Sequence, residues 1–269
     1  MRARKRFGQN FLNDQLTIQG IIDAIRPSES DHVLEIGPGH GALTESLVAS
    51  GCQLDVVEID RDLAAELRQR YPGLNVIEAD ILKFDFNQIR GGRPLRVVGN
   101  LPYNISTPLL FMLFEKLDMI EDMYFMLQLE VVERMAAAAS TSQYGRLSIM
   151  SQYFCAAEKL FDVPPSAFTP APKVTSAVAQ MIPHAQRTPL HDRLLLQSLV
   201  IQAFSQRRKT VRNALKRYLS GSELLELGID PEQRPETITG FDYIQCANYL
   251  SARDVPAPNQ LAPSSEFSG

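Results

Sequence analysis

One segment constrains the fold of this chain more than any other. An apolar run at Val33–Ile36 leads into Gly37-Pro38-Gly39-His40-Gly41, and a helical pattern then continues to about Gly51. Further strand-like runs follow at residues 53–60, 75–80, 95–100 and 123–130. Helical patterns separate them, notably at residues 61–71 and 107–117. Strands that alternate with helices predict an α/β fold with a mostly parallel sheet and right-handed crossovers.

The rest of the chain divides at about residues 184–190. Before this point, a helix is expected over 13–26, another over 146–155, and a final strand pair at 158–163 and 176–183. After it, helical patterns cover 191–219, 222–229 and 242–253. We therefore expect an α/β domain over residues 1–186 and a small all-helical domain over 187–253. The proline- and serine-rich tail, 254–269, is expected to be disordered.

Cysteine and histidine usage argues against a disulfide framework or a metal centre. Cys52, Cys155 and Cys246 are odd in number and far apart, and the four histidines show no ligand spacing with them. The basic N-terminus is not followed by the apolar run of a signal peptide, and no apolar stretch approaches the length of a membrane span. These features predict a cytoplasmic protein without a metal and without a membrane contact.

Basic residues are concentrated in two segments, although the formal net charge is −4. Ten of the 27 Lys and Arg residues lie within 1–6 and 207–217, and neither segment contains an acid. The nucleic-acid-binding candidates in them are Arg4, Lys5, Arg6, Arg207, Arg208, Lys209 and Arg212. Concentrated positive charge suits a phosphate backbone, although a charge run is also an ordinary solvated surface.

Three successive strands end in residues suited to a nucleoside cofactor. Gly37 and Gly39 allow a close backbone approach, and the G-x-G-x-G spacing fits an amino acid joined to a nucleoside better than a pyrophosphate. Glu58, at the end of the second strand, can accept both ribose hydroxyls, and Asp80, after the third, can accept from an adenine amino group. Individually, a tight turn and helix-capping acids would explain the same residues.

The fourth strand ends in Asn100-Leu101-Pro102-Tyr103, the candidate catalytic residues. An adenine amino nitrogen is a poor nucleophile, because its lone pair is delocalised into the ring. The Asn100 side-chain carbonyl and the Leu101 backbone carbonyl can accept its two N–H bonds. Pro102 adds no competing donor, and Tyr103 can stack on an extruded base. A plain β-turn is the alternative interpretation of the tetrapeptide.

Phe168 lies in a proline-rich loop, Pro164-Pro165-Ser166-Ala167-Phe168-Thr169-Pro170. An exposed aromatic side chain on a rigid loop could stack on the other face of the target base. The same side chain could instead pack in the core.

Together these segments resemble the rRNA adenine N6-methyltransferases, and within them the bacterial 16S rRNA adenine dimethyltransferases of the KsgA/RsmA type. The similarity covers about residues 4–250, in RKRFGQNFLND, VLEIGPGHGALT, VVEID, GNLPYNISTPLL, YGRLS, VPPSAFTPAPKV and AFSQRRKTVRNAL.

The resemblance implies a Rossmann-like class I methyltransferase fold: a mostly parallel seven-stranded sheet with helices on both faces, plus a helical RNA-binding C-terminal domain. It implies S-adenosyl-L-methionine as methyl donor, with Asn10 and Leu12 closing over this cofactor beside Gly37, Gly39, Glu58, Asp80 and Asn100. It also implies dimethylation of two adjacent adenosines in the 3′-terminal hairpin of 16S rRNA in the small ribosomal subunit, and a role in ribosome biogenesis.

Two other functions remain open. One is methylation of large-subunit rRNA by the same chemistry, and the other is a non-catalytic ribosome-assembly factor. A monomer is expected, since nothing in the sequence requires a dimer.

Overall fold

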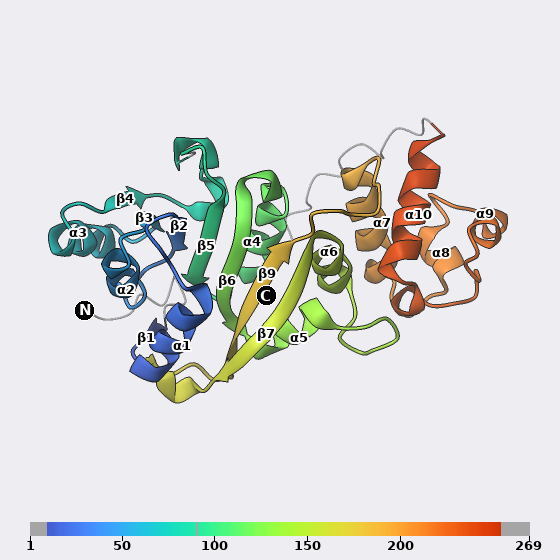
Figure 1. The fold of residues 1–269 in the computed structure, drawn as a ribbon. Coiled ribbons are helices and arrows are strands. Elements are labelled where there is room, and N and C mark those ends of the chain that lie inside the picture. The colour runs from blue at the N-terminus through green and yellow to red at the C-terminus, as the bar shows by residue number, and fades with distance from the viewer. Residues whose placement is uncertain (1–9, 90, 254–269) are drawn as a thin grey trace. The chain divides into compact units, whose positions relative to one another are not determined.

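The computed structural model describes residues 10–89 and 91–253. Its elements follow one another along the chain as the colours in Figure 1 show. The strands are β1 (Phe11–Leu12), β2 (His32–Ile36), β3 (Gln53–Glu58), β4 (Asn75–Glu78), β5 (Leu95–Asn100), β6 (Ile120–Gln128), β7 (Cys155–Val163), β8 (Phe168–Thr169) and β9 (Ser176–Pro183). The α-helices are α1 (Gln15–Ile25), α2 (Thr44–Ala49), α3 (Arg61–Arg70), α4 (Ser106–Leu113), α5 (Leu129–Ala136), α6 (Arg146–Phe154), α7 (Arg193–Ser205), α8 (Val211–Leu215), α9 (Gly221–Glu226) and α10 (Gly240–Ser251).

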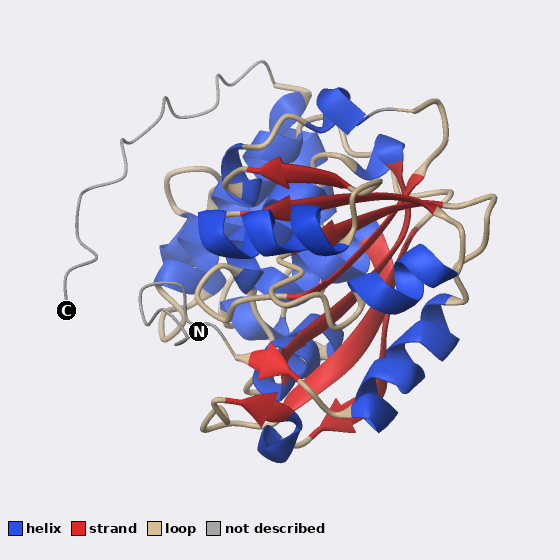
Figure 2. Ribbon diagram, turned by 90° about the vertical axis from the view of Figure 1, so that its left-hand side faces the viewer, coloured by secondary structure: helices blue, strands red, loops and turns tan. Residues whose placement is uncertain are grey.

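Seven strands form one sheet in the order β4-β3-β2-β5-β6-β9-β7. All pairs from β4 to β6 are parallel, whereas β9 pairs antiparallel with both β6 and β7. Figure 2 shows helices on both sides of these strands. The predicted Rossmann-like fold with seven mostly parallel strands is confirmed, including the final strand pair.

The order places β2 and β5 side by side at the centre, so that the glycine turn after β2 and the Asn-Leu-Pro-Tyr turn after β5 are neighbours. Gly99 makes this approach possible. A Cβ atom at this position would lie 2.5 Å from the carbonyl oxygen of Ile36, which is inside van der Waals contact. The strand ends therefore meet closely only because residue 99 has no side chain.

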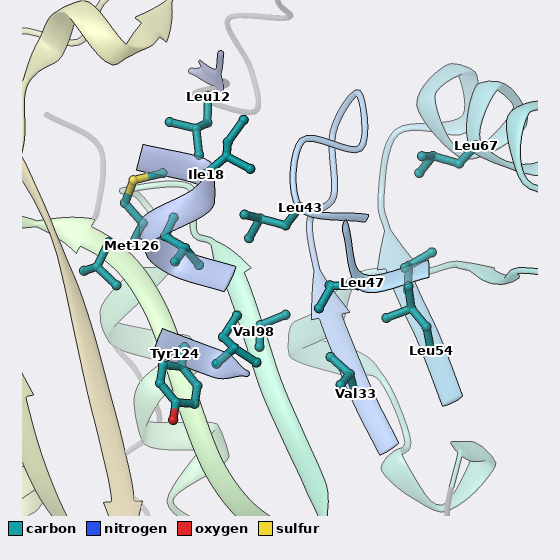
Figure 3. Close-up of a cluster of buried hydrophobic side chains, with 14 of the residues drawn as sticks. Leu12, Ile18, Val33, Leu43, Leu47, Leu54, Leu67, Val98, Tyr124 and Met126 are labelled. Atoms are coloured by element: carbon teal, nitrogen blue, oxygen red, sulfur yellow. The ribbon is translucent and has the colours of Figure 1, made fainter. Parts of the chain in front are cut away.

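Apolar side chains of α1, α2 and α3 pack against one face of the sheet. Figure 3 shows Ile18 of α1 near Leu12 and Met126, and Leu47 of α2 near Val33. All belong to one buried cluster. Asp14 begins α1 by accepting the backbone N–H of Thr17, so the predicted helix at 13–26 is confirmed over 15–25.

Buried polar contacts join the strands at their amino ends. Arg96 of β5 donates to Asp122 of β6, with Nη2 2.8 Å from Oδ2, and to Asp31 before β2, with Nη1 3.1 Å from Oδ2. His32 of β2 contacts Asp55 of β3 at 2.6 Å. These contacts offset the cost of burying the polar side chains, although Nδ1 of His32 is buried without a hydrogen-bond partner among the described residues.

The chain separates into two compact units. Among the described residues, the first comprises 10–89, 91–136 and 154–185, and the second comprises 137–153 and 186–253. Residues 137–153, which the sequence assigns to the α/β domain, therefore pack with the C-terminal helices. The contacts behind this include hydrogen bonds from Ser140 N–H to the Glu236 carbonyl and from Arg207 to the carbonyls of Thr141 and Ser142.

Two predicted elements differ in their bounds. The strand expected at 123–130 runs from Ile120 to Gln128, and α5 begins at Leu129. The helix expected over 191–219 is interrupted, because residues 206–210 form a turn between α7 and α8. The backbone N–H groups of Val211 and Arg212 instead donate to the carbonyls of Gln233 and Pro231.

None of the described helices has the length and apolarity needed to cross a bilayer. The expected disordered tail, 254–269, lies outside the described residues.

Candidate active site

A cavity of about 240 Å³ opens at the carboxyl ends of the parallel strands. This edge is where open α/β sheets bind their ligands. Ten residues singled out from the sequence line it: Asn10, Leu12, Gly37, Gly39, Glu58, Asp80, Asn100, Leu101, Pro102 and Tyr103. The structure therefore brings the predicted cofactor-binding and catalytic segments together in one cavity, apart from Phe168.

The glycine turn has a backbone that other residues rarely adopt. Gly37, Gly39 and Gly41 have φ angles of 64°, 59° and 83°. A Cβ atom on Gly39 would lie 3.0 Å from the ring of Phe11, and this ring also contacts His40, with centroids 4.5 Å apart. β1 thus lies directly against the turn. Phe11 and His40 are lining residues that sequence reasoning missed.

Backbone N–H groups hold the Glu58 carboxylate beside the glycine turn. Its carboxylate accepts from Gly39 N–H at 3.2 Å and from Asp60 N–H at 2.9 Å, and the side chain is buried. Burial raises the pKa of this carboxyl, and the two backbone hydrogen bonds oppose that shift. A carboxylate fixed in this way retains lone pairs that can accept from a ligand's hydroxyls.

Glu35 is a second buried carboxyl in the cavity wall, and sequence reasoning did not single it out. Its Oε2 accepts from the Thr44 hydroxyl at 2.6 Å. Burial raises the pKa of Glu35 to about 7 against this hydrogen bond, and the charge of Glu58 adds to the rise. The signal that could have identified it is an acid two residues before the first glycine of the turn.

Asp80 is half-buried at the end of β4 and lines the cavity. It also accepts from Leu82 N–H at 3.1 Å and begins a short 3₁₀ turn at Ile81–Lys83. Asp80 is therefore a helix cap, as the alternative interpretation of this residue expects. The cap uses Oδ1, so the second carboxylate oxygen is not used by it.

The Asn100 amide has a defined orientation. Its Nδ2 donates to the backbone carbonyl of Asn10 at 3.0 Å. The side-chain oxygen, Oδ1, is therefore the group of this amide that remains to accept hydrogen bonds. Tyr103, three residues on, is half-buried, and its hydroxyl lies 2.7 Å from the Ser176 hydroxyl.

Phe168 does not line the cavity. Its side chain is 4 % exposed and belongs to the buried hydrophobic cluster that contains Leu12, and β8 pairs antiparallel with β1. The expectation of an exposed ring is wrong, because pairing with β1 turns this loop inward. A stacking role for Phe168 stays a prediction.

The basic candidates differ in their surroundings. Arg4, Lys5 and Arg6 lie outside the described residues. Arg207 donates to two backbone carbonyls, and Arg212 pairs with Glu232 at 2.9 Å. Arg208 and Lys209 are exposed in the turn between α7 and α8, and no ion pair to either is found among the described residues.

Fold and cavity together define a methyltransferase. Residues 1–252 match the model of the family described as ribosomal RNA adenine dimethylase, and the chain belongs to this family. It is 52 % identical over 260 residues to the ribosomal RNA small subunit methyltransferase A of Yersinia pestis (strain Pestoides F), covering 94 % of this chain and 96 % of the relative.

Two solved structures share the fold. A dimethyladenosine transferase from Plasmodium falciparum superposes with a TM-score of 0.75 at 26 % identity, over 90 % of this chain and 98 % of that one. The 23S rRNA methyltransferase ErmE superposes with a TM-score of 0.66 at 26 % identity, over 90 % of this chain and 100 % of that one.

The cavity's chemistry suits a cationic nucleoside. Glu35, Glu58 and Asp80 are in its wall, and its lining, as far as the chain is described, contains no lysine or arginine. Within residues 10–89 and 91–253, no three His, Cys, Asp or Glu side chains form a group that could hold a metal ion.

Proposed function

We propose that this protein transfers methyl groups from S-adenosyl-L-methionine to N6 of two adjacent adenosines in the 3′-terminal hairpin of 16S rRNA. The substrate is the small ribosomal subunit, and the reaction belongs to ribosome biogenesis in the cytoplasm. The observation that carries the proposal is the Asn100 amide. Its Nδ2 donates to the Asn10 carbonyl, while its Oδ1 remains as an acceptor beside an acidic cavity of about 240 Å³.

The cofactor-binding role falls to residues at three strand ends. Glu58 accepts the ribose hydroxyls, Asp80 accepts from the adenine amino group, and the backbone of Gly37 and Gly39 approaches the amino-acid part. Asn10 and Leu12 close the cavity from β1, and Asn100 contributes to its wall. When bound, the cofactor supplies a methyl group on a positively charged sulfur, which the acidic wall favours over neutral or anionic ligands.

The target amine is activated by acceptors on the turn after β5. In the first transfer, Asn100 Oδ1 and the Leu101 carbonyl accept the two N–H bonds of the amine, which favours a pyramidal nitrogen with its lone pair directed into the cavity. In the second transfer one N–H bond remains, and one of these two oxygens accepts it. Pro102 contributes no competing donor, and Tyr103 stacks on the base. The methylated nitrogen then loses a proton to solvent, so no general base is required. Positioning and electrostatics supply the acceleration.

RNA binding is assigned to the second unit, which contains the helical residues 187–253 and also 137–153. Its exposed turn at residues 206–210 carries Arg208 and Lys209. We expect phosphate contacts from this turn and from Arg4, Lys5 and Arg6, with the protein acting as a monomer. The described basic residues are not all equivalent, since Arg207 and Arg212 already have protein partners.

A second candidate, methylation of large-subunit rRNA, is favoured by the likeness to ErmE. The 52 % identity over 94 % of the chain to a small-subunit enzyme favours the first candidate. The deciding experiment incubates the protein and labelled S-adenosylmethionine with separated, unmodified subunits and analyses the nucleosides by mass spectrometry. N6,N6-dimethyladenosine in small-subunit RNA supports the proposal, and label only in large-subunit RNA contradicts it.

A non-catalytic assembly factor is tested more simply. Titration of S-adenosylmethionine into the pure protein should show saturable binding that depends on Glu58. A protein that joins small subunits but does not bind the cofactor would support the assembly role instead.

A further inference from the structure

Ser176 lies two strands away from the proposed catalytic turn, yet its side chain reaches it. β6 separates β5 from β9, and the register pairs Asn100 with Met126 and Gln128 with Ser176. The Ser176 Oγ lies 2.7 Å from the hydroxyl of Tyr103. Ser176 is 0 % exposed, so its hydroxyl is closed to solvent and depends on protein partners.

This contact fixes the far end of the Tyr103 ring. The near end is fixed by the turn in which Ile105 N–H donates to the Pro102 carbonyl. A tyrosine held at both its Cβ atom and its hydroxyl cannot swing about its Cα–Cβ bond, although its ring can still rotate about the axis that runs from Cβ to the hydroxyl oxygen. The ring is therefore kept at one place beside the cavity that Tyr103 lines.

We propose that Ser176 is a positioning residue for base stacking: its hydroxyl holds the Tyr103 ring at the place where the ring receives the extruded adenine. This inference rests on the proposed function, since it concerns the same target base. It adds a residue on β9 to a site otherwise built from β1 and the ends of β2 to β5. An aromatic ring that is already in place before the base arrives reduces the entropy lost on stacking.

The test compares four variants: Ser176→Ala, Tyr103→Phe, the two combined, and Tyr103→Ala. Phenylalanine keeps the ring and removes only the hydroxyl. A neutral hydrogen bond of this kind corresponds to about a 2- to 10-fold effect. We expect Ser176→Ala and Tyr103→Phe each to lower kcat by this factor, and the double variant to lose no more than either one. Tyr103→Ala should lose considerably more, because the stacking surface is gone.

Affinity for S-adenosylmethionine should be unchanged in Ser176→Ala, which separates positioning from a general loss of structure. Ser151→Ala is the matched control. Ser151 is equally buried, and its hydroxyl has no hydrogen-bond partner among the described residues, so its kcat should stay at the wild-type value. Wild-type kcat in Ser176→Ala, or additive losses in the double variant, would overturn the inference.

A readout independent of activity distinguishes failure of this inference from failure of the proposed function. Burial raises the pKa of the Tyr103 hydroxyl, and the hydrogen bond between Tyr103 and Ser176 opposes that shift. Ser176→Ala should therefore raise the pKa of Tyr103 further. This pKa is measured by carbon-13 NMR of the tyrosine ring, and the signal of Tyr103 is assigned by its loss in Tyr103→Phe. If the wild type transfers no methyl groups, the proposed function fails. An unchanged pKa of Tyr103 in Ser176→Ala would instead show that the contact between Ser176 and Tyr103 is absent, and it would overturn this inference whether or not the protein is active.

Discussion

The side-chain nitrogen of Asn100 donates to the backbone carbonyl of Asn10, across 3.0 Å and 90 residues of sequence. Asn10 precedes β1, which lies against the glycine turn through Phe11. The residue proposed to accept the target amine is therefore oriented by the same segment that borders the cofactor cavity. A shift of this segment would alter both cofactor binding and the direction of Oδ1.

Asn100→Asp tests this orientation with almost no change in shape. Aspartate has no donor for the Asn10 carbonyl, and its charge repels that oxygen. We expect kcat to fall by about 100-fold or more, the loss typical of removing one well-placed group from a transition state. Cofactor affinity, measured by calorimetry, should change much less. Asn87→Asp adds the same charge at an exposed position outside the cavity lining and should keep most activity.

Glu58→Ala should weaken binding of S-adenosylmethionine. Hydrogen bonds to a charged group contribute about 1.5–3 kcal/mol each, so losing even one ribose contact reduces affinity at least about tenfold. Calorimetric titration measures the dissociation constant directly. Glu78→Ala is the control, since Glu78 also ends a parallel strand but is exposed and pairs with Arg61. Equal affinity in Glu58→Ala and wild type would contradict the ribose role.

Glu35 should make folding stability depend on pH. Its folded-state pKa, about 7, is above the ordinary value of 4.5, so its favourable contribution is complete below about pH 4.5 and lost as pH rises through 7. The free energy of unfolding should fall by about 1–3 kcal/mol over this range from this group alone. Glu35→Gln mimics the protonated form and should remove that dependence in thermal unfolding at pH 5 to 8. Exposed Glu121→Gln should follow the wild-type curve, and parallel curves for all three proteins would refute the assignment.

We expect the basic side chains in the turn between α7 and α8 to contact RNA phosphates. Replacing Arg208 and Lys209 together with alanine should reduce the slope of log K against log salt by about 1.5, because two phosphate contacts are lost. Filter binding to the target hairpin at several salt concentrations measures the slope. Arg207→Ala should instead lower the melting temperature, since Arg207 binds the carbonyls of Thr141 and Ser142. A slope unchanged by the double variant would move the RNA contact elsewhere.

The fold and most of the cavity follow from local sequence patterns. Gly37, Glu58, Asp80 and Asn100 each come at the end of an apolar run. Because the carboxyl ends of parallel strands share one edge, such residues must gather there once the strand order is known. The same reasoning explains why the alternation of strands and helices predicts the sheet.

Contacts between residues distant in sequence could not be predicted in this way. The pairing of β1 with β8, which buries Phe168, involves only two residues on each strand and leaves no periodic pattern. The hydroxyl pair of Tyr103 and Ser176 depends on β9 entering next to β6. The break at 206–210 also lacks glycine or proline, so the helical pattern continued through it.

The buried ion pairs of Arg96 and Asp122 and the contact of His32 with Asp55 lie at the amino ends of the strands, whereas the cavity lies at their carboxyl ends. Mutations that alter which nucleotide is accepted can therefore accumulate around the cavity without loosening the contacts that join the strands. Divergence of target among such enzymes requires no new scaffold, and a designer who wishes to redirect the methyl group can leave the opposite edge untouched.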